Sequence, residues 1–384
     1  MNQSGQKPLA DKKIICFSRF ENNPSSHGGD KRAAQICEFL QQFDYEFVST
    51  CNPPFIVPQK MHALLYNPSG YFQKKRSLRY KQRITYAKYF KWSERFRDAL
   101  LNWHFLSQLF IENLDKSPEL LIIDDPVFLA PVVLYAKSRG IPIVALIHNI
   151  ETLSREQVEY SHQREMFTYE LELLSHCALV VTISQEETWL LRNFGMDPVY
   201  LPYFPIKQSA DRCDNVRTKR QHSIKANFLL FGTVYNLPTL EGMKKVITAI
   251  TRDSILHNDR LIIAGYGTIQ LANFADDPRI EVRGDLTDAE LDELLTETKG
   301  CIVYQVNGSG ALTKIPEILT AGVPVIINSH AARSHHNLPG IFEFDTFEQL
   351  GEQLEAAAQA KQFPKVLSPP DSTILKKRIL DLIK

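Results

Sequence analysis

The sequence lacks several features that would assign it to a specialised class of protein. Its 384 residues contain no apolar run that approaches the roughly 20 residues of a membrane span. The polar N-terminus lacks the apolar core of a signal peptide. Six scattered cysteines without a C-x-x-C pair argue against a disulfide framework and against a cysteine metal site. Lys plus Arg equals Asp plus Glu, 44 each, so no global charge attracts nucleic acid or membrane. These absences predict a cytoplasmic globular protein.

Length and hydrophobic patterning predict two α/β domains. A chain of 384 residues is long for a single core. Short Val/Ile/Leu runs alternate with helix-length segments, which favours parallel sheets covered by helices on both faces. The strands expected in the first half are residues 13–20, 45–51, 120–125, 142–149 and 178–184. A second series is expected at residues 228–236, 260–267, 279–286, 301–306 and 323–328.

This pattern sets the expected domain organisation. Residues 1–207 are expected to form an N-terminal domain, and the polar residues 208–226 a linker. Residues 227–366 are expected to form a C-terminal domain, and the helical tail 367–384 is expected to pack back on the N-terminal domain. Both domains are expected to be Rossmann-like, doubly wound α/β units that face each other across a cleft.

One stretch departs from the regular alternation. Residues 71–100 carry ten Lys or Arg against Glu94 and Asp98, with aromatic residues interleaved. This composition fits a solvated pair of surface helices. It also fits a patch that contacts anionic head groups or a phosphate-bearing acceptor, and we expect peripheral membrane contact through residues 71–97. Nucleic acid is a third, less favoured partner for such a patch.

Glycines and polar residues follow several of the expected strands. Gly28 and Gly29 separate the first strand from its helix, where backbone amides can approach an oxygen-rich ligand, unless they form a simple turn. His148 closes the strand at 142–149, where it is either a structural hydrogen-bonding group or a residue of the site. Gly265 and Gly267 begin a dinucleotide fingerprint, but Gln270 stands where its third glycine should be, which argues against an NAD-linked enzyme.

The stretch GSGALTKIPEILTAGVPVI, residues 308–326, carries the most specific signal. Its Gly-Ser-Gly loop follows a strand and would direct free amides at an anion, helped by the positive end of the next helix. Lys314 adds a positive charge for phosphate, and the Glu317 carboxylate can accept two hydrogen bonds from the vicinal diol of a ribose. The alternative is a surface pair between Lys314 and Glu317, three residues apart on the helix.

This stretch resembles the nucleotide-sugar site of GT-B glycosyltransferases, especially the retaining enzymes classified as family 4. Those enzymes show a Gly-rich loop, a basic residue, a Glu and then A-x-G-x-P-V-I. The matching residues are Lys314, Glu317, Ala321, Gly322, Pro324, Val325 and Ile326. The motifs HGG, HN, VVTIS, YLPYFP, FGTVYN, AGYG and IEVRGDL occur in the family's order. The resemblance covers most of the chain and is weakest at residues 58–115.

The resemblance implies that residues 1–207 bind the acceptor and that residues 227–366 bind the nucleotide sugar. It also implies roles for individual residues. Glu317 is expected to bind the donor ribose, and His148 is expected to lie near the transferred sugar. Together with Lys314 they form the expected catalytic set. Gly28 and Gly29 would approach the diphosphate from the opposite domain. The residues expected to contact the donor are Gly232, Thr233, Gly265, Tyr266, Gly308, Ser309, Gly310, Ala311, Leu312 and Thr313.

Two departures from the family pattern concern charge. Ser309 stands where the family has the first glutamate of a pair, and Thr233 stands where many members have an arginine. The loop at residues 233–242 contains no Lys or Arg, so Lys314 would have to neutralise much of the departing pyrophosphate. The chain contains no D-x-D sequence. We therefore expect no metal and no cofactor beyond the nucleotide-sugar donor.

The resemblance implies a hexosyl-type glycosyltransferase of EC class 2.4. The enzyme would transfer a sugar from a nucleoside-diphosphate sugar to a glycan or lipid-linked acceptor, with retention of configuration, in the synthesis of cell-surface polysaccharide or glycoconjugate. The alternative is a catalytically silent GT-B protein that serves as a partner subunit or a nucleotide-sugar-binding module. The missing arginine and glutamate motivate that alternative.

Overall fold

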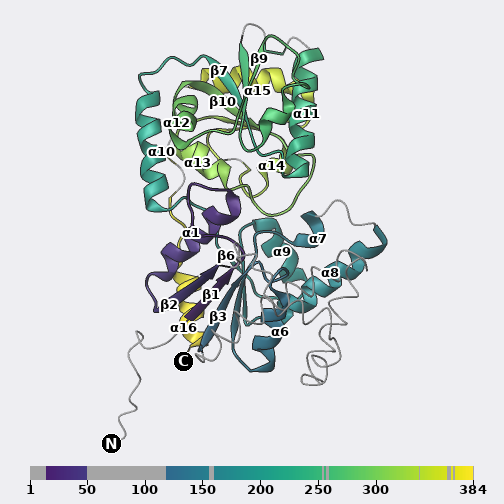
Figure 1. Cartoon of the computed structure of the whole chain (residues 1–384), viewed down its shortest axis with the longest axis vertical. Helices are drawn as coiled ribbons and strands as arrows, with labels where there is room; N and C mark the ends of the chain where they lie inside the picture. The colour runs from purple at the N-terminus through teal and green to yellow at the C-terminus, as the bar shows by residue number, and fades with distance from the viewer. Residues whose placement is uncertain are drawn as a thin grey trace, which may run out of the picture.

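A computed structural model describes residues 14–49, 118–154, 160–252, 255–256, 259–336, 338–360, 365 and 368–383. These residues form two α/β domains, one above the other in Figure 1. The basic and aromatic stretch 71–100, with its predicted membrane contact, lies outside the described residues.

The described part of the N-terminal domain contains a six-stranded parallel sheet. Its order is β2 (Tyr45–Ser49), β1 (Ile14–Ser18), β3 (Leu120–Asp124), β4 (Ile143–Leu146), β5 (Leu179–Thr182) and β6 (Val199–Tyr200). Every residue of β1, β3, β4 and β5 is buried, because these strands are covered on both faces and their sequences are apolar almost throughout.

Helices cover the N-terminal sheet on two faces, each with its own apolar cluster. On one face, α6 (Ala130–Ser138) and α8 (Tyr160–Ser175) pack on β1 and β3. On the other face, α1 (Gly28–Leu40) packs beside the C-terminal helix α16 (Thr373–Leu382). Figure 1 shows α16, in yellow, beside β1 and β2, far from the rest of the C-terminal half. Two further helices, α7 (Glu151–Ser154) and α9 (Gln185–Asn193), follow β4 and β5.

The C-terminal domain repeats this plan with a second six-stranded parallel sheet in its described residues. The order is β12 (Ile341–Glu343), β11 (Val325–Ile327), β10 (Thr298–Val303), β7 (Asn227–Phe231), β8 (Arg260–Ala264) and β9 (Ile280–Gly284). One face is covered by α11 (Leu237–Arg252) and α15 (Phe347–Gln359). The other is covered by α12 (Asp288–Glu297) and α13 (Lys314–Thr320). The short η2 (Thr268–Leu271) and α14 (Ser329–Ala332) complete the domain.

The segment expected to be a linker, residues 208–226, is largely helical. Helix α10 (Lys207–Arg220) packs its buried Val216 into the C-terminal core, between α12 and α13. Arg220 donates hydrogen bonds to the carbonyl oxygens of Gly322 and Thr298, at 3.0 and 2.9 Å. The segment expected to be a linker thus contains a helix that is polar almost throughout and has few buried residues. The proposed domain boundaries stay a prediction.

The strand orders place a topological switch point in each domain. In the N-terminal sheet, β2 is added on one side of β1 and β3 on the other, so the switch point lies between β1 and β3. In the C-terminal sheet, β8 and β10 lie on the two sides of β7, so the switch point lies between β7 and β10. Ligands of open α/β sheets bind outside the carboxyl ends of the strands at such points. A site is therefore expected where the residues that follow these four strands meet.

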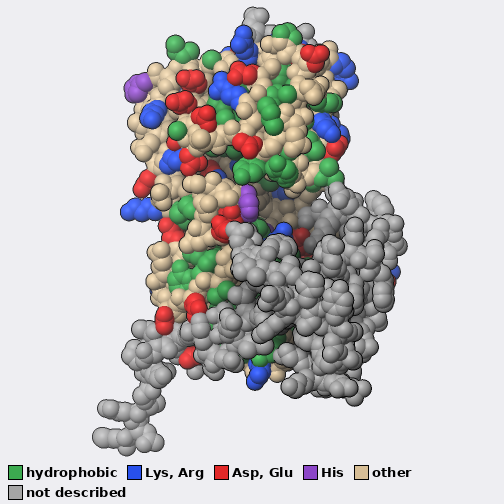
Figure 2. Space-filling model, viewed as in Figure 1, with side chains coloured by type: hydrophobic (Ala, Val, Ile, Leu, Met, Phe, Trp, Pro, Cys, Tyr) green, Lys and Arg blue, Asp and Glu red, His purple; other side chains and the backbone are tan. Residues whose placement is uncertain are grey.

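The surface shows no dominant charge on the face drawn in Figure 2, where acidic and basic side chains are interspersed. This agrees with the net charge of zero. Among the described residues, no helix combines the length and the apolar character needed to cross a membrane.

Candidate functional site between the two sheets

The carboxyl ends of the two sheets face each other, so that loops of both domains meet. Gly28, which follows β1, lies against α13, where an added Cβ would stand 2.8 Å from Oγ1 of Thr313. Gly310, which follows β10, has a φ of +70°, and an added Cβ would overlap the carbonyl oxygen of His148. The missing side chains permit both close approaches. Predicted site residues from the two domains are thus brought together.

Lys314 and Glu317 are not paired with each other. Nζ of Lys314 donates a 2.9 Å hydrogen bond to the carbonyl oxygen of Phe231, at the end of β7, and a Cβ on Gly232 would lie 3.4 Å from it. Burial, together with the nearby charge of Lys31, lowers the pKa of Lys314 to about 8. The alternative of a Lys314–Glu317 surface pair is therefore wrong.

Both oxygens of the Glu317 carboxylate contact the N-terminal domain. Oε2 forms an ion pair with Nζ of Lys31 on α1, and Oε1 accepts a 2.8 Å hydrogen bond from the hydroxyl of Tyr203. The Glu317 side chain is 16% exposed. Burial, followed by the charge of Glu317, raises the pKa of Tyr203. The predicted ribose-binding group is thus at the domain interface, but it is occupied by protein groups.

A small cavity adjoins this ion pair. Its volume is about 30 Å³, which is room for water but not for a nucleotide. Side chains of both domains line it, among them Lys31, Phe231, Lys314 and Glu317. A nucleotide could therefore reach Glu317 only after the domains or the Lys31 side chain move.

The sequence predicted free amides in the Gly-Ser-Gly loop, but at least one of these amides is bonded to the protein itself. The amide of Gly310 donates to Oε1 of Glu187 on α9 at 2.9 Å, and the amide of Ile150 donates to the same oxygen at 2.7 Å. Glu187 is 3% exposed, and its Oε2 has no hydrogen-bond partner among the described residues. Burial raises the pKa of Glu187. The anion that meets this loop amide is thus a carboxylate of the protein itself.

Arg333 holds the same loop from the C-terminal side. It donates to the carbonyl oxygens of Ser309 and Gly310 at 2.8 and 2.7 Å. It also lies beside Gly308, whose φ is +140°. Leu312 packs against the apolar cluster that contains α13. The loop is therefore a rigid connection between β10 and α13.

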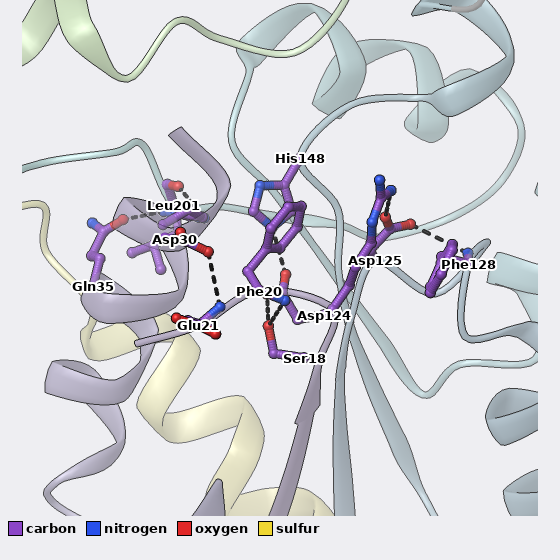
Figure 3. A network of polar contacts seen from close by, with 12 residues as sticks. Ser18, Phe20, Glu21, Asp30, Gln35, Asp124, Asp125, Phe128, His148 and Leu201 are labelled. Atoms are coloured by element: carbon purple, nitrogen blue, oxygen red, sulfur yellow. Dashed lines mark hydrogen bonds and ion pairs between the residues drawn. The ribbon is translucent and has the colours of Figure 1, made fainter. Parts of the chain in front are cut away.

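His148 belongs to a buried polar network of the N-terminal domain, shown in Figure 3. Its Nε2 lies 2.6 Å from Oδ1 of Asp124, and the Ser18 hydroxyl donates to Oδ2 of the same carboxylate at 2.6 Å. The rings of His148 and Phe20 lie 4.6 Å apart. Burial alone would lower the pKa of His148, but the charge and hydrogen bond of Asp124 outweigh it and raise the pKa. This orientation leaves Nδ1 as the nitrogen for a ligand.

The other predicted donor-binding residues lie at the ends of β7 and β8. Gly265 has a φ of +121°, and a Cβ there would overlap the carbonyl oxygen of Gly232, so the two strand ends touch. Tyr266 is 67% exposed, and its ring centroid lies 6.0 Å from that of Tyr235. Oγ1 of Thr233 accepts a 3.3 Å hydrogen bond from the amide of Tyr235.

Five further residues that were not predicted from the sequence contact the predicted site residues: Lys31, Asp124, Glu187, Tyr203 and Arg333. Asp124 ends a buried strand, which is a signal that could have found it. Tyr203 lies within the family-like YLPYFP motif. The other three lie on helices or a turn without a distinguishing pattern. Among the described residues, no three His, Cys, Asp or Glu side chains cluster to hold a metal.

The chain is similar to known proteins in its fold and not in its sequence. No protein-family model matches the sequence, and no curated protein matches it either. Three similar solved structures have sequence identities of 11 to 12%. The UDP-forming α,α-trehalose-phosphate synthase from Burkholderia xenovorans, in complex with glucose-6-phosphate, has a TM-score of 0.60 and 11% identity, with 97% of this chain and 96% of that chain covered.

Sucrose-phosphate synthase from Thermosynechococcus elongatus also has a TM-score of 0.60, at 12% identity, with 97% of this chain and 95% of that chain covered. Alr3699/HepE from Anabaena, in complex with UDP and glucose, has a TM-score of 0.55 at 12% identity, with 97% of each chain covered. These likenesses and the two facing parallel sheets confirm that the chain has the two-domain GT-B fold predicted from its sequence.

Proposed function

We propose that this protein is a glycosyltransferase that transfers a sugar from a nucleoside-diphosphate sugar to an acceptor hydroxyl. The observation that carries the proposal is that Gly28 lies against Thr313, and Lys31 against Glu317, where the switch points of the two sheets face each other. Two of the similar structures contain UDP or a UDP-sugar analogue, which makes UDP the first nucleotide to test.

In the proposed reaction, the bond between the sugar carbon and the diphosphate oxygen breaks, the acceptor oxygen bonds to that carbon, and the proton of the acceptor hydroxyl passes to the leaving diphosphate. The leaving diphosphate takes the electron pair and gains negative charge, which the Lys314 ammonium can stabilise. The Glu317 carboxylate would accept hydrogen bonds from the ribose diol. His148, oriented by Asp124, would present Nδ1 to the sugar or the acceptor.

The finer parts of the proposal rest on the sequence resemblance. They are retention of configuration, membership of family 4, a hexose as the transferred sugar, and a glycan or lipid-linked acceptor in cell-surface polysaccharide or glycoconjugate synthesis. Independence of metals and cofactors, a cytoplasmic location and membrane contact through residues 71–97 belong to the same set of proposals. Each of the roles assigned to site residues is likewise a proposal.

Replacement of Glu317 tests the proposal. Glu317→Ala removes the acceptor for two charge-assisted hydrogen bonds, so the affinity for UDP should fall by about 100-fold or more. The measurement is isothermal calorimetry, with circular dichroism to show that the variant is folded.

A matched control is Glu352→Ala, because Glu352 is exposed on α15, on the sheet face opposite α13. That variant should bind UDP like the natural protein. Equal UDP affinity in the Glu317→Ala variant and the natural protein would contradict the proposed site.

A second candidate function is a catalytically silent GT-B protein that binds nucleotide sugar without transferring it. Both oxygens of Glu317 are bonded to groups of the N-terminal domain. In addition, the neutral residues Ser309 and Thr233 stand where the family pattern has a glutamate and an arginine. Slow hydrolysis of sugar nucleotides separates the two candidates. Binding of a sugar nucleotide without any turnover across a panel of donors would favour the silent protein.

A further inference from the structure

Lys31 provides a cation that the C-terminal loop lacks. It lies in the first turn of α1, three residues after Gly28, and its side chain crosses the domain interface to Glu317. The residues that follow β7, from 233 to 242, form a loop and the start of α11, and they include no Lys or Arg. Lys31 therefore brings positive charge from the N-terminal domain to the place where the diphosphate is expected.

Three cations lie close together around Lys31. Lys31, Arg212 and Lys314 line the small cavity together with Asp292 and Glu317. Arg212 is already paired with Asp288 and Asp292, at 2.8 Å each. Lys31 is paired with Glu317, whereas Lys314 donates to the carbonyl oxygen of Phe231 and not to that carboxylate. A ligand with two or more negative charges would stabilise this cluster better than one carboxylate does.

The scaffold beneath Lys31 is rigid. The neighbouring side chain, Arg32, is buried and donates to the carbonyl oxygens of Leu201 and Pro202 at 2.7 and 3.4 Å, and Gln35 donates to Pro202 at 3.0 Å. These bonds fix α1 to the segment that carries Tyr203. The backbone of Lys31 is therefore held in place, while its four-carbon side chain can reorient.

We propose that Lys31 is a donor-binding residue that exchanges partners. In the free protein it neutralises Glu317; when the donor binds, its ammonium moves to the diphosphate and leaves Glu317 to the ribose. This inference rests on the proposed function. The exchange follows from the geometry, because Lys31 and Tyr203 already occupy the two carboxylate oxygens that the ribose would need.

The ratio of the affinities for UDP and for uridine tests the exchange. Both ligands need access to Glu317, but UDP alone carries the diphosphate. Lys31→Ala should therefore reduce the preference for UDP over uridine by about tenfold or more, because one charge-assisted contact is lost. Affinity for uridine itself should stay equal or rise, because the Glu317 carboxylate is released. Isothermal calorimetry with UDP and uridine measures both affinities.

Tyr203→Phe is the matched control, because it also removes a contact to Glu317 but changes no charge. It should leave the preference for UDP unchanged. If Lys31→Ala alters both affinities by the same factor, or neither, Lys31 is a lock on Glu317 or a structural residue, and the inference is overturned while the proposed function stands. If Tyr203→Phe lowers the preference as much as Lys31→Ala, the inference is also overturned. If the natural protein binds neither ligand and no other nucleoside diphosphate, both proposals fail.

Discussion

At the scale of single residues, Lys314 shows how burial sets chemistry. The side chain ends at the carbonyl oxygen of Phe231, away from bulk water. Its pKa is lowered to about 8, mainly by burial and also by the charge of Lys31, whereas Cys301 opposes the shift. Burial raises the pKa of Cys301 itself to about 12, so this neighbour is a neutral thiol near pH 8. Lys314 therefore loses its charge near pH 8, well below the ordinary pKa of 10.5 for a lysine.

The affinity for UDP should depend on pH around this value. Below about pH 8 Lys314 is protonated and can bind the diphosphate; as pH rises through 8 in the free protein, the charge is lost and the affinity should fall. Calorimetry from about pH 7 to 9 should show this decline for UDP but not for uridine. Lys314→Met should bind UDP about tenfold or more weakly at pH 7 and show no decline. A decline that persists in Lys314→Met would assign the titration to another group.

At the scale of structural elements, the loop between β10 and α13 is held from both sides. Arg333 binds its carbonyl oxygens, and Glu187 on α9 accepts the amide of Gly310 together with that of Ile150. Because Oε2 of Glu187 is buried without a partner among the described residues, the carboxylate charge is costly, whereas its role as acceptor is favourable.

Two substitutions of Glu187 separate the acceptor from the charge. Glu187→Gln keeps an oxygen for both amides and removes the buried charge, so stability at pH 7 should be equal or higher. Glu187→Ala leaves two buried amides without an acceptor and should cost about 2–5 kcal/mol of unfolding free energy. Urea denaturation measures both.

The pH dependence of stability supplies a check. Since the pKa of Glu187 is raised in the folded state, the folded protein holds this proton more tightly than the unfolded chain. This group therefore lowers stability as pH rises from about 4.5 through the raised pKa, and Glu187→Gln should lose that component. Equal destabilisation by Gln and Ala would show that the charge itself is needed.

At the scale of the whole molecule, contacts between the domains close the site. Lys31 and Tyr203 bind Glu317, and Gly310 lies against His148. A nucleotide that binds Glu317 would therefore displace these groups of the N-terminal domain from its carboxylate.

Gly310→Ala should force the domains apart. The new Cβ would overlap the carbonyl oxygen of His148, and a φ of +70° adds backbone strain of about 1–2 kcal/mol. Small-angle X-ray scattering should then show a larger radius of gyration. The control is Gly195→Ala, where φ is +78° but no atom lies within 4 Å of the added Cβ, so strain appears without interdomain overlap. An unchanged radius of gyration in Gly310→Ala would show that the loop yields instead of the interface.

Local sequence determined most of the elements. The buried strands were predictable because β1, β3, β4 and β5 are continuous apolar runs, which any parallel sheet with two covered faces requires. The strands β6 and β12 were missed because they have two and three residues, too few for a pattern. Helix α10 was misread because nearly all of its surface is polar.

The sequence by itself determined the fold class, the strand end after which His148 lies, and the helix on which Lys314 and Glu317 lie, because these elements follow from local hydrophobic patterning. The partners of these residues were decided by tertiary structure. Lys31 and Glu317 are 286 residues apart, and Glu187 and Gly310 are 123 apart. Such pairs form because one domain packs on the other. This packing produces no periodic pattern in the sequence of either segment. The charge balance of the site is therefore a property of the domain interface.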